Sequence, residues 1–210
     1  MTAADQVAAW ARGRSPRAGR TRVLAVEGRS GAGKSDLATA VADRLGAELL
    51  RLDDLYPGWD GLLAGVTAAH DWVLEPLSRD APARWRRWDW ATGRYAEWHP
   101  VGDRDWLVVD GVGSGARQLA PYLSGVVWVD APTALRRARA LARDGDTYAP
   151  HWSRWAAQED AYYAADDVRG RADLVVDTSP GRVVDTSPGS IIGTSCEGSI
   201  IGTSSERASA

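Results

Sequence analysis

The sequence is poor in several residue types, and each shortage narrows what the protein can be. It has one cysteine, Cys196, among 210 residues, so no internal disulfide can form and a reducing compartment fits the chain. No apolar run approaches the ~20 residues of a membrane-spanning helix, and the N-terminus lacks the basic start and apolar core of a signal peptide. These absences predict a soluble, cytoplasmic protein that does not associate with membranes.

The chain also lacks a large net charge, and it contains no phenylalanine. The formal net charge is -3, so the surface as a whole does not attract nucleic acid or anionic membranes. We therefore expect small molecules as partners and no nucleic acid. With no phenylalanine and 11 tryptophans, tryptophan also serves as the large core aromatic, and packing is the default interpretation of any one of them. The sequence does not decide the oligomeric state, and a homo-oligomer is one of the options.

The length and composition suit one domain. With 210 residues, of which 44% are hydrophobic and 25% charged, the chain is long enough for one α/β core and too short for two. We expect an N-terminal helix and loop over residues 1–20, the main domain over 21–178 and a repetitive tail over 179–210. In the C-terminal part VVDTSPG and IIGTS each occur twice, and the richness in Ser, Gly and Thr predicts poor order. The alternative is a small strand added to a sheet edge.

The main domain opens with the most specific motif of the chain. Residues 28–35 read GRSGAGKS, a complete G-x-x-x-x-G-K-[ST] phosphate-binding loop. The apolar segment 22–27 before it predicts a buried strand. After it, Leu37, Val41 and Leu45 recur every four residues, as on the inner face of a helix. The motif therefore has the strand, loop and helix context that it requires.

The residue types of this loop explain how it would bind ATP. Glycines let successive N–H groups turn inward around phosphate oxygens, and the helix that begins near Lys34 adds the positive end of its dipole. Lys34, the one lysine beside 24 arginines, is predicted to reach the β- and γ-phosphates, and the Ser35 hydroxyl to bind Mg²⁺. The predicted ATP-binding residues are Gly28, Ser30, Gly31, Ala32, Gly33, Lys34 and Ser35.

Two acidic residues follow apolar segments whose ends are expected at one edge of the sheet. Asp53 would accept the proton of a hydroxyl that attacks the γ-phosphate. Asp110 ends a Walker B pattern and would hold Mg²⁺ together with Ser35. The alternatives are a turn-capping role for Asp53 or Asp54 and a turn-forming role for Asp110.

Six of the 11 tryptophans fall between residues 59 and 98, interleaved with arginines. This density favours an aromatic-walled pocket for a flat ligand, with Asp89 and Arg94 as polar contacts. A surface salt bridge is the alternative for these two residues. His70 and Asp71 are weaker candidates, because a solvated turn explains them equally well.

Two helices are predicted near the end of the main domain. One begins after Asp130-Ala131-Pro132 and ends at Arg143, and the other spans residues 151–167. Arg136, Arg139 and Arg143 share one face of the first helix. They would neutralise charge on a transferring phosphoryl group, or they form a solvated basic face.

Together these segments predict a P-loop NTPase-type α/β fold. It would have a doubly wound parallel sheet of about five strands, helices on both faces and a small lid. The expected strands span residues 22–27, 47–52, 106–111, 126–129 and 172–177.

With these motifs in place, residues 23–177 resemble the uridine kinase family of P-loop kinases. The similar segments, besides the phosphate loop, are Asp53-Asp54-Leu55-Tyr56 (D-x-F-Y in the family), Trp88-Asp89-Trp90 with Arg94 (Y-D-F…R), Val109-Asp110-Gly111 (the E-G strand end), Arg136-Arg137 through Arg143-Asp144 (R-R…R-D of the lid helix) and Ala172 to Val176 (A-D-V-I-I). The resemblance implies that Asp53 is the catalytic base and that Arg139 or Arg143 closes over the transferring group. It also implies that Tyr56, Trp88, Asp89 and Arg94 contact a nucleoside.

The sequence departs from the family at two places. The F-D-H-P segment is represented only by His70-Asp71-Trp72, and Thr92 and Gly93 stand near the place of the base-reading histidine. The resulting hypothesis is an ATP- and Mg²⁺-dependent kinase that phosphorylates a hydroxyl of a nucleoside. The alternatives are a kinase for another small alcohol, such as a vitamin riboside or a sugar acid, and an ATP-binding protein without transferase activity.

Overall fold

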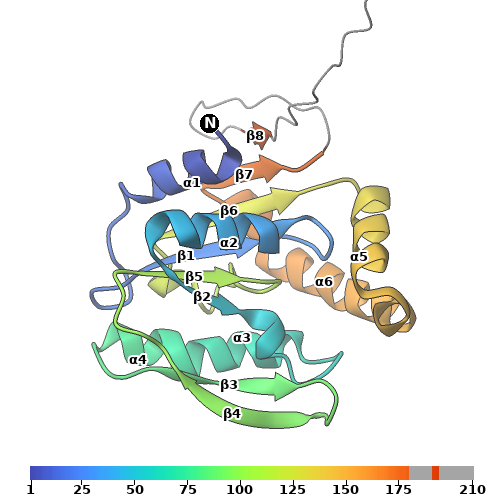
Figure 1. Ribbon diagram of the computed structural model, residues 1–210, viewed down its shortest axis with the longest axis horizontal. Helices are drawn as coiled ribbons and strands as arrows, with labels where there is room; N and C mark the ends of the chain where they lie inside the picture. The colour runs from blue at the N-terminus through green and yellow to red at the C-terminus, as the bar shows by residue number, and fades with distance from the viewer. Residues whose placement is uncertain (180–190, 194–210) are drawn as a thin grey trace, which may run out of the picture.

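The computed structural model describes residues 1–179 and 191–193, and a six-stranded sheet forms its centre (Figure 1). The strand order is β2-β5-β1-β6-β7-β8, and all neighbours are parallel. The bounds are Arg22–Glu27 (β1), Glu48–Arg51 (β2), Trp106–Asp110 (β5), Gly125–Asp130 (β6), Leu174–Asp177 (β7) and Ile191–Gly193 (β8). The predicted parallel α/β sheet is confirmed, and its five expected strands are β1, β2, β5, β6 and β7.

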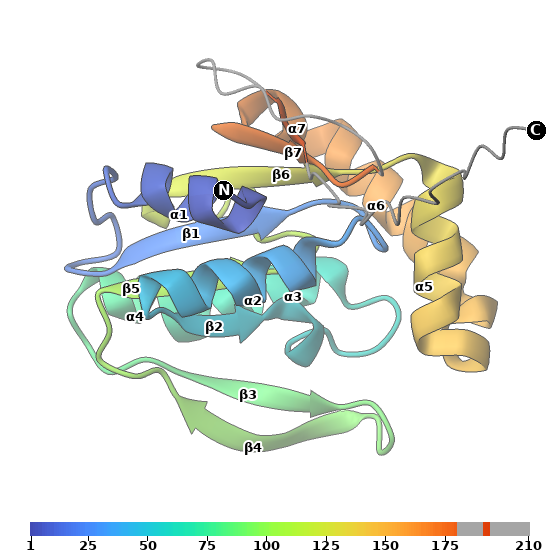
Figure 2. The ribbon, with the colours of Figure 1, turned by 45° about the horizontal axis from the view of Figure 1, so that its top comes forward.

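Helices cover both faces of this sheet (Figure 2). They are α1 (Ala3–Ala11) and α2 (Lys34–Leu45) on one face and α3 (Leu62–Ala69), α6 (Trp152–Asp166) and α7 (Val168–Arg171) on the other. Successive residues of a strand point to opposite faces. In β1, Leu24 and Val26 pack in the cluster that contains α1 and α2. Val23 and Ala25 pack in the cluster that contains α3 and α6, so both faces of the central strand are buried.

The parallel arrangement gathers the loops that carry the candidate chemistry. Because every strand of the sheet runs the same way, the segments that follow β1, β2, β5, β6 and β7 emerge at one edge. Register places Val26 of β1 and Arg51 of β2 beside Asp110 of β5. The phosphate loop follows β1 directly, so the loop and Asp110 lie close together although more than 70 residues separate them in the sequence.

The last part of the tryptophan-rich segment forms a second sheet that the sequence analysis did not predict. It is an antiparallel hairpin of β3 (Arg84–Asp89) and β4 (Arg94–Pro100). The Asp89 carboxylate accepts hydrogen bonds from the N–H groups of Ala91 and Thr92, at 2.9 and 3.2 Å, and Gly93 takes a left-handed φ of 64°. These two features make the tight turn that reverses the chain. Before the hairpin, α3 continues through a π-helical turn (η2, His70–Leu74) into α4 (Glu75–Ser78).

The helix α5 (Thr133–Tyr148), for which the sequence predicts a lid, stands at the carboxyl end of the sheet beside α6 (Figure 1). The helix was predicted to end at Arg143, with Asp144-Gly145 as the stop. The backbone breaks at Gly145, where φ is 49° and ψ is -131°, a conformation that glycine adopts at low cost. The short turns η1 (Leu52–Asp54), η3 (Ala120–Tyr122) and η4 (Ala149–His151) complete the described elements.

Most of the repetitive tail, including Cys196, lies outside the described residues. The prediction of poor order for the tail therefore falls mostly on residues outside the described part. Within the tail, β8 pairs in parallel with β7, with Val175 opposite Ile191 and Asp177 opposite Gly193. Among the described residues, no helix has the length and apolar character needed to cross a membrane.

Candidate active site

The phosphate loop has a backbone that only glycine can supply at two positions. Gly31 has a φ of 78°, and a Cβ there would lie 2.1 Å from the carbonyl oxygen of Arg136. A Cβ on Gly28 would lie 2.3 Å from the carbonyl oxygen of Val129. Beyond the loop, α2 begins at Lys34, and the N–H groups of its first turn have no partner within the helix. The loop and the helix start together form a cradle for an anion.

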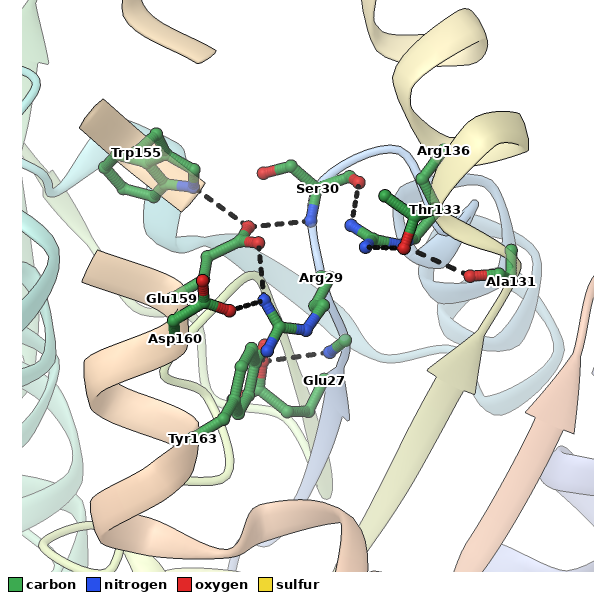
Figure 3. A network of polar contacts seen from close by, with 11 residues as sticks. Glu27, Arg29, Ser30, Ala131, Thr133, Arg136, Trp155, Glu159, Asp160 and Tyr163 are labelled. Atoms are coloured by element: carbon green, nitrogen blue, oxygen red, sulfur yellow. Dashed lines mark hydrogen bonds and ion pairs between the residues drawn. The ribbon is translucent and has the colours of Figure 1, made fainter. Parts of the chain in front are cut away.

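Side chains from α5 and α6 hold this loop in place (Figure 3). The Ser30 N–H donates to Glu159 Oε1 at 2.8 Å, and the Ser30 carbonyl accepts from Arg136 Nη1 at 3.2 Å. Arg29 Nη1 donates to Asp160 at 2.6 Å. Glu159 and Arg136 are 2% and 7% exposed, so these contacts are shielded from water. The loop is thus fixed from α5 on one side and from α6 on the other.

Glu27, the last residue of β1, is a buried anchor beneath the loop that sequence reasoning missed. Its carboxylate is completely buried and accepts five hydrogen bonds. The donors are the N–H groups of Gly28, Gly113 and Gly115 and the hydroxyls of Tyr162 and Tyr163. Burial raises the pKa of Glu27, while the hydrogen bonds and the charge of Lys34 lower it. An acidic residue that ends an apolar strand just before the loop was the available signal.

Removing one of these donors should cost stability in a pH-dependent way. Tyr163 donates to Glu27 Oε1 at 2.8 Å, so Tyr163→Phe should lower the free energy of unfolding at pH 7 by about 1–2 kcal/mol. The donor favours the ionised carboxylate, so its loss raises the pKa of folded Glu27 further. The resulting loss in the free energy of unfolding is absent at low pH, where Glu27 is protonated in both the folded and the unfolded chain. It grows as the pH rises and Glu27 ionises. Urea unfolding at pH 4 and pH 7 measures the difference.

Tyr95→Phe is the matched control for this experiment. The Tyr95 hydroxyl donates to a neutral group, the carbonyl of Leu55, at 3.0 Å. Loss of this hydrogen bond should lower the free energy of unfolding by a similar amount at pH 4 and pH 7, because the Leu55 carbonyl does not titrate. If Tyr163→Phe lowers the free energy of unfolding equally at both pH values, the interpretation that Tyr163 stabilises an ionised Glu27 carboxylate is contradicted.

The donor set around Asp110 fits a magnesium ion. Asp110 is 3% exposed, and its Oδ1 has no hydrogen-bond partner among the described residues. Its Oδ2 lies 3.3 Å from Arg51 Nη1. Burial raises the pKa of Asp110, and the Lys34 charge and the Ser35 side chain lower it. A buried carboxylate oxygen without a partner, beside a hydroxyl, supplies the hard oxygen ligands that Mg²⁺ takes.

The protein would provide only part of such a coordination shell. Within the described part of the chain there is no group of three or more His, Cys, Asp or Glu side chains that could hold a metal. Mg²⁺ usually keeps several waters and is bound by one or two protein oxygens together with substrate phosphates. The predicted pair of Ser35 and Asp110 agrees with that mode, and its role stays a prediction.

Asp53 and Lys34 both line a pocket of about 500 Å³ at the carboxyl end of the sheet. Asp53 lies in η1, directly after β2, and its side chain is exposed. Lys34 is 9% exposed. The complete lining is Ser30, Lys34, Asp53, Tyr56, Trp59, Trp90, Arg143, Tyr148 and Trp155. The structure therefore brings the predicted base, the phosphate-loop lysine and one predicted lid arginine to one cavity.

Five aromatic side chains form the rest of this wall, with Trp59 in the middle. Its ring centroid lies 4.9 Å from that of Trp90, 5.4 Å from that of Tyr148 and 6.5 Å from that of Trp155. Tyr56 and Trp90 belong to motifs predicted to contribute to the site, and Trp59 and Trp90 belong to the tryptophan-rich segment for which the sequence predicts an aromatic-walled pocket. Trp59, Tyr148 and Trp155 come from separate loops and helices, and sequence spacing carried no signal that they meet.

Several polar atoms of this wall are already engaged. The indole N–H of Trp90 donates to the Asp53 carbonyl at 3.1 Å, and that of Trp155 donates to Glu159 at 3.1 Å. The Tyr56 hydroxyl donates to the Val112 carbonyl at 2.6 Å. Burial raises the pKa of Tyr148 to about 12. The wall accordingly offers mainly ring faces to a ligand.

The other predicted acceptor contacts lie on the hairpin and not in this pocket. Asp89 caps the β3–β4 turn, where hydrogen bonds from Thr92 lower its pKa, and Arg94 is its exposed partner across the hairpin. Trp88 packs edge-on against Tyr95, with 5.0 Å between ring centroids. None of the three lines the pocket, and their predicted contact with a nucleoside stays a prediction.

The weaker candidates His70 and Asp71 are also placed elsewhere. His70 Nδ1 lies 2.6 Å from Asp71 Oδ1, and its Nε2 lies 3.2 Å from the Tyr122 hydroxyl. Neither residue lines the pocket.

The three arginines of α5 have three different environments. Arg136 is buried against the phosphate loop and also bonds to the Thr133 side chain and the Ala131 carbonyl. Arg139 donates to the hydroxyl and the carbonyl of Thr178, both at 2.9 Å. The Thr178 hydroxyl in turn donates to the Ala32 carbonyl at 2.7 Å. Arg143 lines the pocket. Of these two, only Arg143 lines the pocket, and the predicted role of Arg139 and Arg143 at the phosphates stays a prediction.

Comparison with solved structures places this arrangement in a known fold. A structure described as a possible uridine kinase from Bacillus stearothermophilus superposes with a TM-score of 0.59 at 19% identity, over 82% of this chain and 96% of that one. A structure assigned as a fructose transport system kinase from a Silicibacter species superposes with a TM-score of 0.52 at 21% identity, over 83% of this chain and 98% of that one. No protein-family model and no curated protein sequence matches the chain. These likenesses establish a shared fold.

Proposed function

We propose that this chain, whose fold is shared with structures described as kinases, is an ATP- and Mg²⁺-dependent kinase that phosphorylates a hydroxyl of a small molecule. The observation that carries the proposal is the pocket that joins the phosphate loop to Asp53 and to an aromatic wall. A phosphate cradle alone would serve any nucleotide-binding protein. A carboxylate and a ligand-sized cavity beside it supply what transfer to an alcohol also needs.

The loop and its helix would bind the ATP phosphates. Of the N–H groups predicted to bind phosphate, those of Gly28, Ser30 and Ala32 already donate to Glu27, Glu159 and the Arg29 carbonyl. The N–H groups of Gly31, Gly33, Lys34 and Ser35 would therefore bind the phosphates, with the Lys34 ammonium over the β- and γ-phosphates. Ser35 and Asp110 would hold Mg²⁺, which neutralises charge on the phosphates when bound. Lys34 is buried beside these groups, and its charge acts more strongly there than it would in water.

Asp53 would accept the proton of the attacking hydroxyl. Among the described residues, the Asp53 carboxylate makes no hydrogen bond or ion pair, and the Asp53 backbone carbonyl accepts from Trp90. A carboxylate at the mouth of the pocket can therefore turn toward an acceptor hydroxyl. Arg143, which lines the same pocket, would stabilise charge on the transferring group, with Arg139 as the other predicted candidate.

The aromatic wall favours an acceptor that carries a flat ring. Stacking on Trp59, Trp90 and Trp155 suits a nucleoside base or another aromatic riboside. A sugar acid has no flat ring, so we rank it below a nucleoside or a vitamin riboside. Because three polar atoms of the wall are already engaged, the acceptor would be selected by its ring faces more than by its edges.

The test is ADP release by the purified protein with Mg-ATP across nucleosides, other ribosides and sugar acids. Lys34→Ala serves as the blank. We expect turnover on ring-bearing ribosides that is absent from the blank, and little turnover on sugar acids. Thermal stabilisation by ATP without ADP release on any acceptor would contradict the kinase and support the alternative, an ATP-binding protein without transferase activity.

A further inference from the structure

One buried oxygen joins the phosphate loop to the wall of the acceptor pocket. Glu159 Oε1 accepts the Ser30 N–H at 2.8 Å and the Trp155 indole N–H at 3.1 Å (Figure 3). Ser30 belongs to the phosphate loop, and Trp155 lines the pocket. Glu159 and Trp155 are 2% and 4% exposed, so water does not compete for this oxygen. A single atom therefore contacts both halves of the site.

Ser30 is the point at which the loop changes direction. The Ala32 N–H donates to the Arg29 carbonyl at 3.1 Å, and Gly31 has a φ of 78°. These are the marks of a tight turn with Ser30 and Gly31 at its centre. Glu159 holds the N–H of Ser30, and Arg136 holds its carbonyl. The orientation of Ser30 thus sets the direction of the N–H groups that follow, which are the predicted phosphate ligands.

Trp155 also touches the part of the wall that an acceptor would meet. Its ring centroid lies 4.9 Å from that of Tyr56 and 6.5 Å from that of Trp59, and all three residues line the pocket. A ligand that stacks in the pocket would press on this group of rings. The indole N–H of Trp155, the only donor of that side chain, donates to Glu159.

We propose that Glu159 is a positioning residue that couples the acceptor pocket to the phosphate loop. The placement of Trp155 orients the Glu159 carboxylate, and the carboxylate orients Ser30. Acceptor and nucleotide then bind cooperatively, and the coupling is equal in both directions. This inference rests on the proposed function, because it assumes that the loop binds a nucleotide.

The test measures nucleotide affinity after a change in the acceptor pocket. Trp155→Phe keeps an aromatic ring in the wall and removes the N–H that reaches Glu159. We expect it to raise the Kd for the non-hydrolysable analogue AMP-PNP with Mg²⁺ about fivefold, in calorimetric titrations without any acceptor. Trp72→Phe is the matched control, since it also replaces an indole with a phenyl ring, but Trp72 packs against Tyr95 and Trp98 and does not line the pocket. Its Kd for AMP-PNP should stay within about twofold of wild type.

A second variant tests the link through Glu159 itself. Glu159→Gln keeps the side-chain shape and weakens the shared acceptor. In that background, adding Trp155→Phe should raise the Kd by a smaller factor than it does in the wild type, because coupled residues are not additive. Thermal midpoints without nucleotide are measured for every variant, so that a general loss of stability is distinguished from a loss of affinity.

The outcomes separate this inference from the proposed function. If the wild type binds AMP-PNP and Trp155→Phe binds it equally well, or both tryptophan variants weaken it equally, the coupling is overturned and the kinase proposal stands. A fall in thermal midpoint with an unchanged Kd likewise overturns it, since Glu159 would then be merely structural. If the wild type does not bind AMP-PNP at all, the proposed function fails and the coupling fails with it.

Discussion

Lys34→Ala should reduce ADP release by about 10³-fold, the loss typical of removing one preorganised group that stabilises transition-state charge. Lys34 begins α2, is 9% exposed and lines the pocket beside Asp53. Its charge also lowers the pKa of the neighbouring Asp110. Without the ammonium, the γ-phosphoryl group would lose its nearest compact positive charge. Steady-state turnover with the best acceptor of the panel measures the effect.

Lys34→Arg is the informative control. It retains the positive charge, but the planar guanidinium is larger and has a different donor geometry. Because the side chain is buried, we expect this variant to remain impaired by at least about tenfold. The chain has 24 arginines and this single lysine, so the comparison tests directly whether the choice of lysine matters. Turnover above a tenth of wild type in Lys34→Ala would refute its assignment to the phosphates.

Asp53→Asn should lower turnover by about 10²- to 10⁴-fold, the range expected for removal of a general base. Asparagine keeps the shape of the side chain and cannot accept the hydroxyl proton. The exposed carboxylate is not part of the phosphate loop or of the buried core, so the Kd for Mg-AMP-PNP should change by less than about threefold. A fall in turnover without a fall in nucleotide affinity would distinguish a base from a nucleotide ligand.

The adjacent Asp54 provides a matched control. Burial and the neighbouring Asp53 raise the pKa of Asp54, but Asp54 does not line the pocket. Asp54→Asn should therefore retain turnover within about threefold of wild type. Equal losses in both variants would show that the turn after β2 matters only as a structure. Near-wild-type turnover in Asp53→Asn would refute the base assignment.

Local sequence patterns were sufficient for the central part of the fold. The segment from Arg22 to Leu45 contains a buried strand, a glycine loop and an amphipathic helix in immediate succession, and each has a short-range signal. The same holds for Asp110, because an apolar strand that ends in an acidic residue is visible without tertiary information. The hairpin of β3 and β4 was missed because dense tryptophan was interpreted as a pocket wall, although alternating arginine and tryptophan also suits a half-exposed strand.

The pocket itself depended on contacts between distant segments. Asp89 and Arg94 were attractive candidates as neighbours of tryptophan, yet Asp89 is used by the turn of the hairpin. The wall is instead completed by Trp59 together with Tyr148 and Trp155, and Trp59 lies 89 residues before Tyr148 in the sequence. Glu159 was likewise missed, since an isolated glutamate has no pattern until its donors surround it, and Glu27 was missed although it ends the apolar strand before the loop.

By itself, the sequence determined the parallel α/β class, the phosphate loop and the edge of the sheet at which Lys34, Asp53 and Asp110 meet. These features follow from the periodicity of the hydrophobic residues, the glycine spacing of the loop and the alternation of strands with helices, all of which can be read from the sequence. Only the tertiary structure decided which rings face the cavity and which buried carboxylates hold the loop. Those choices depend on packing and on hydrogen bonds between α6, the loop and β1, and residues brought together by folding leave no spacing in the chain that could predict them.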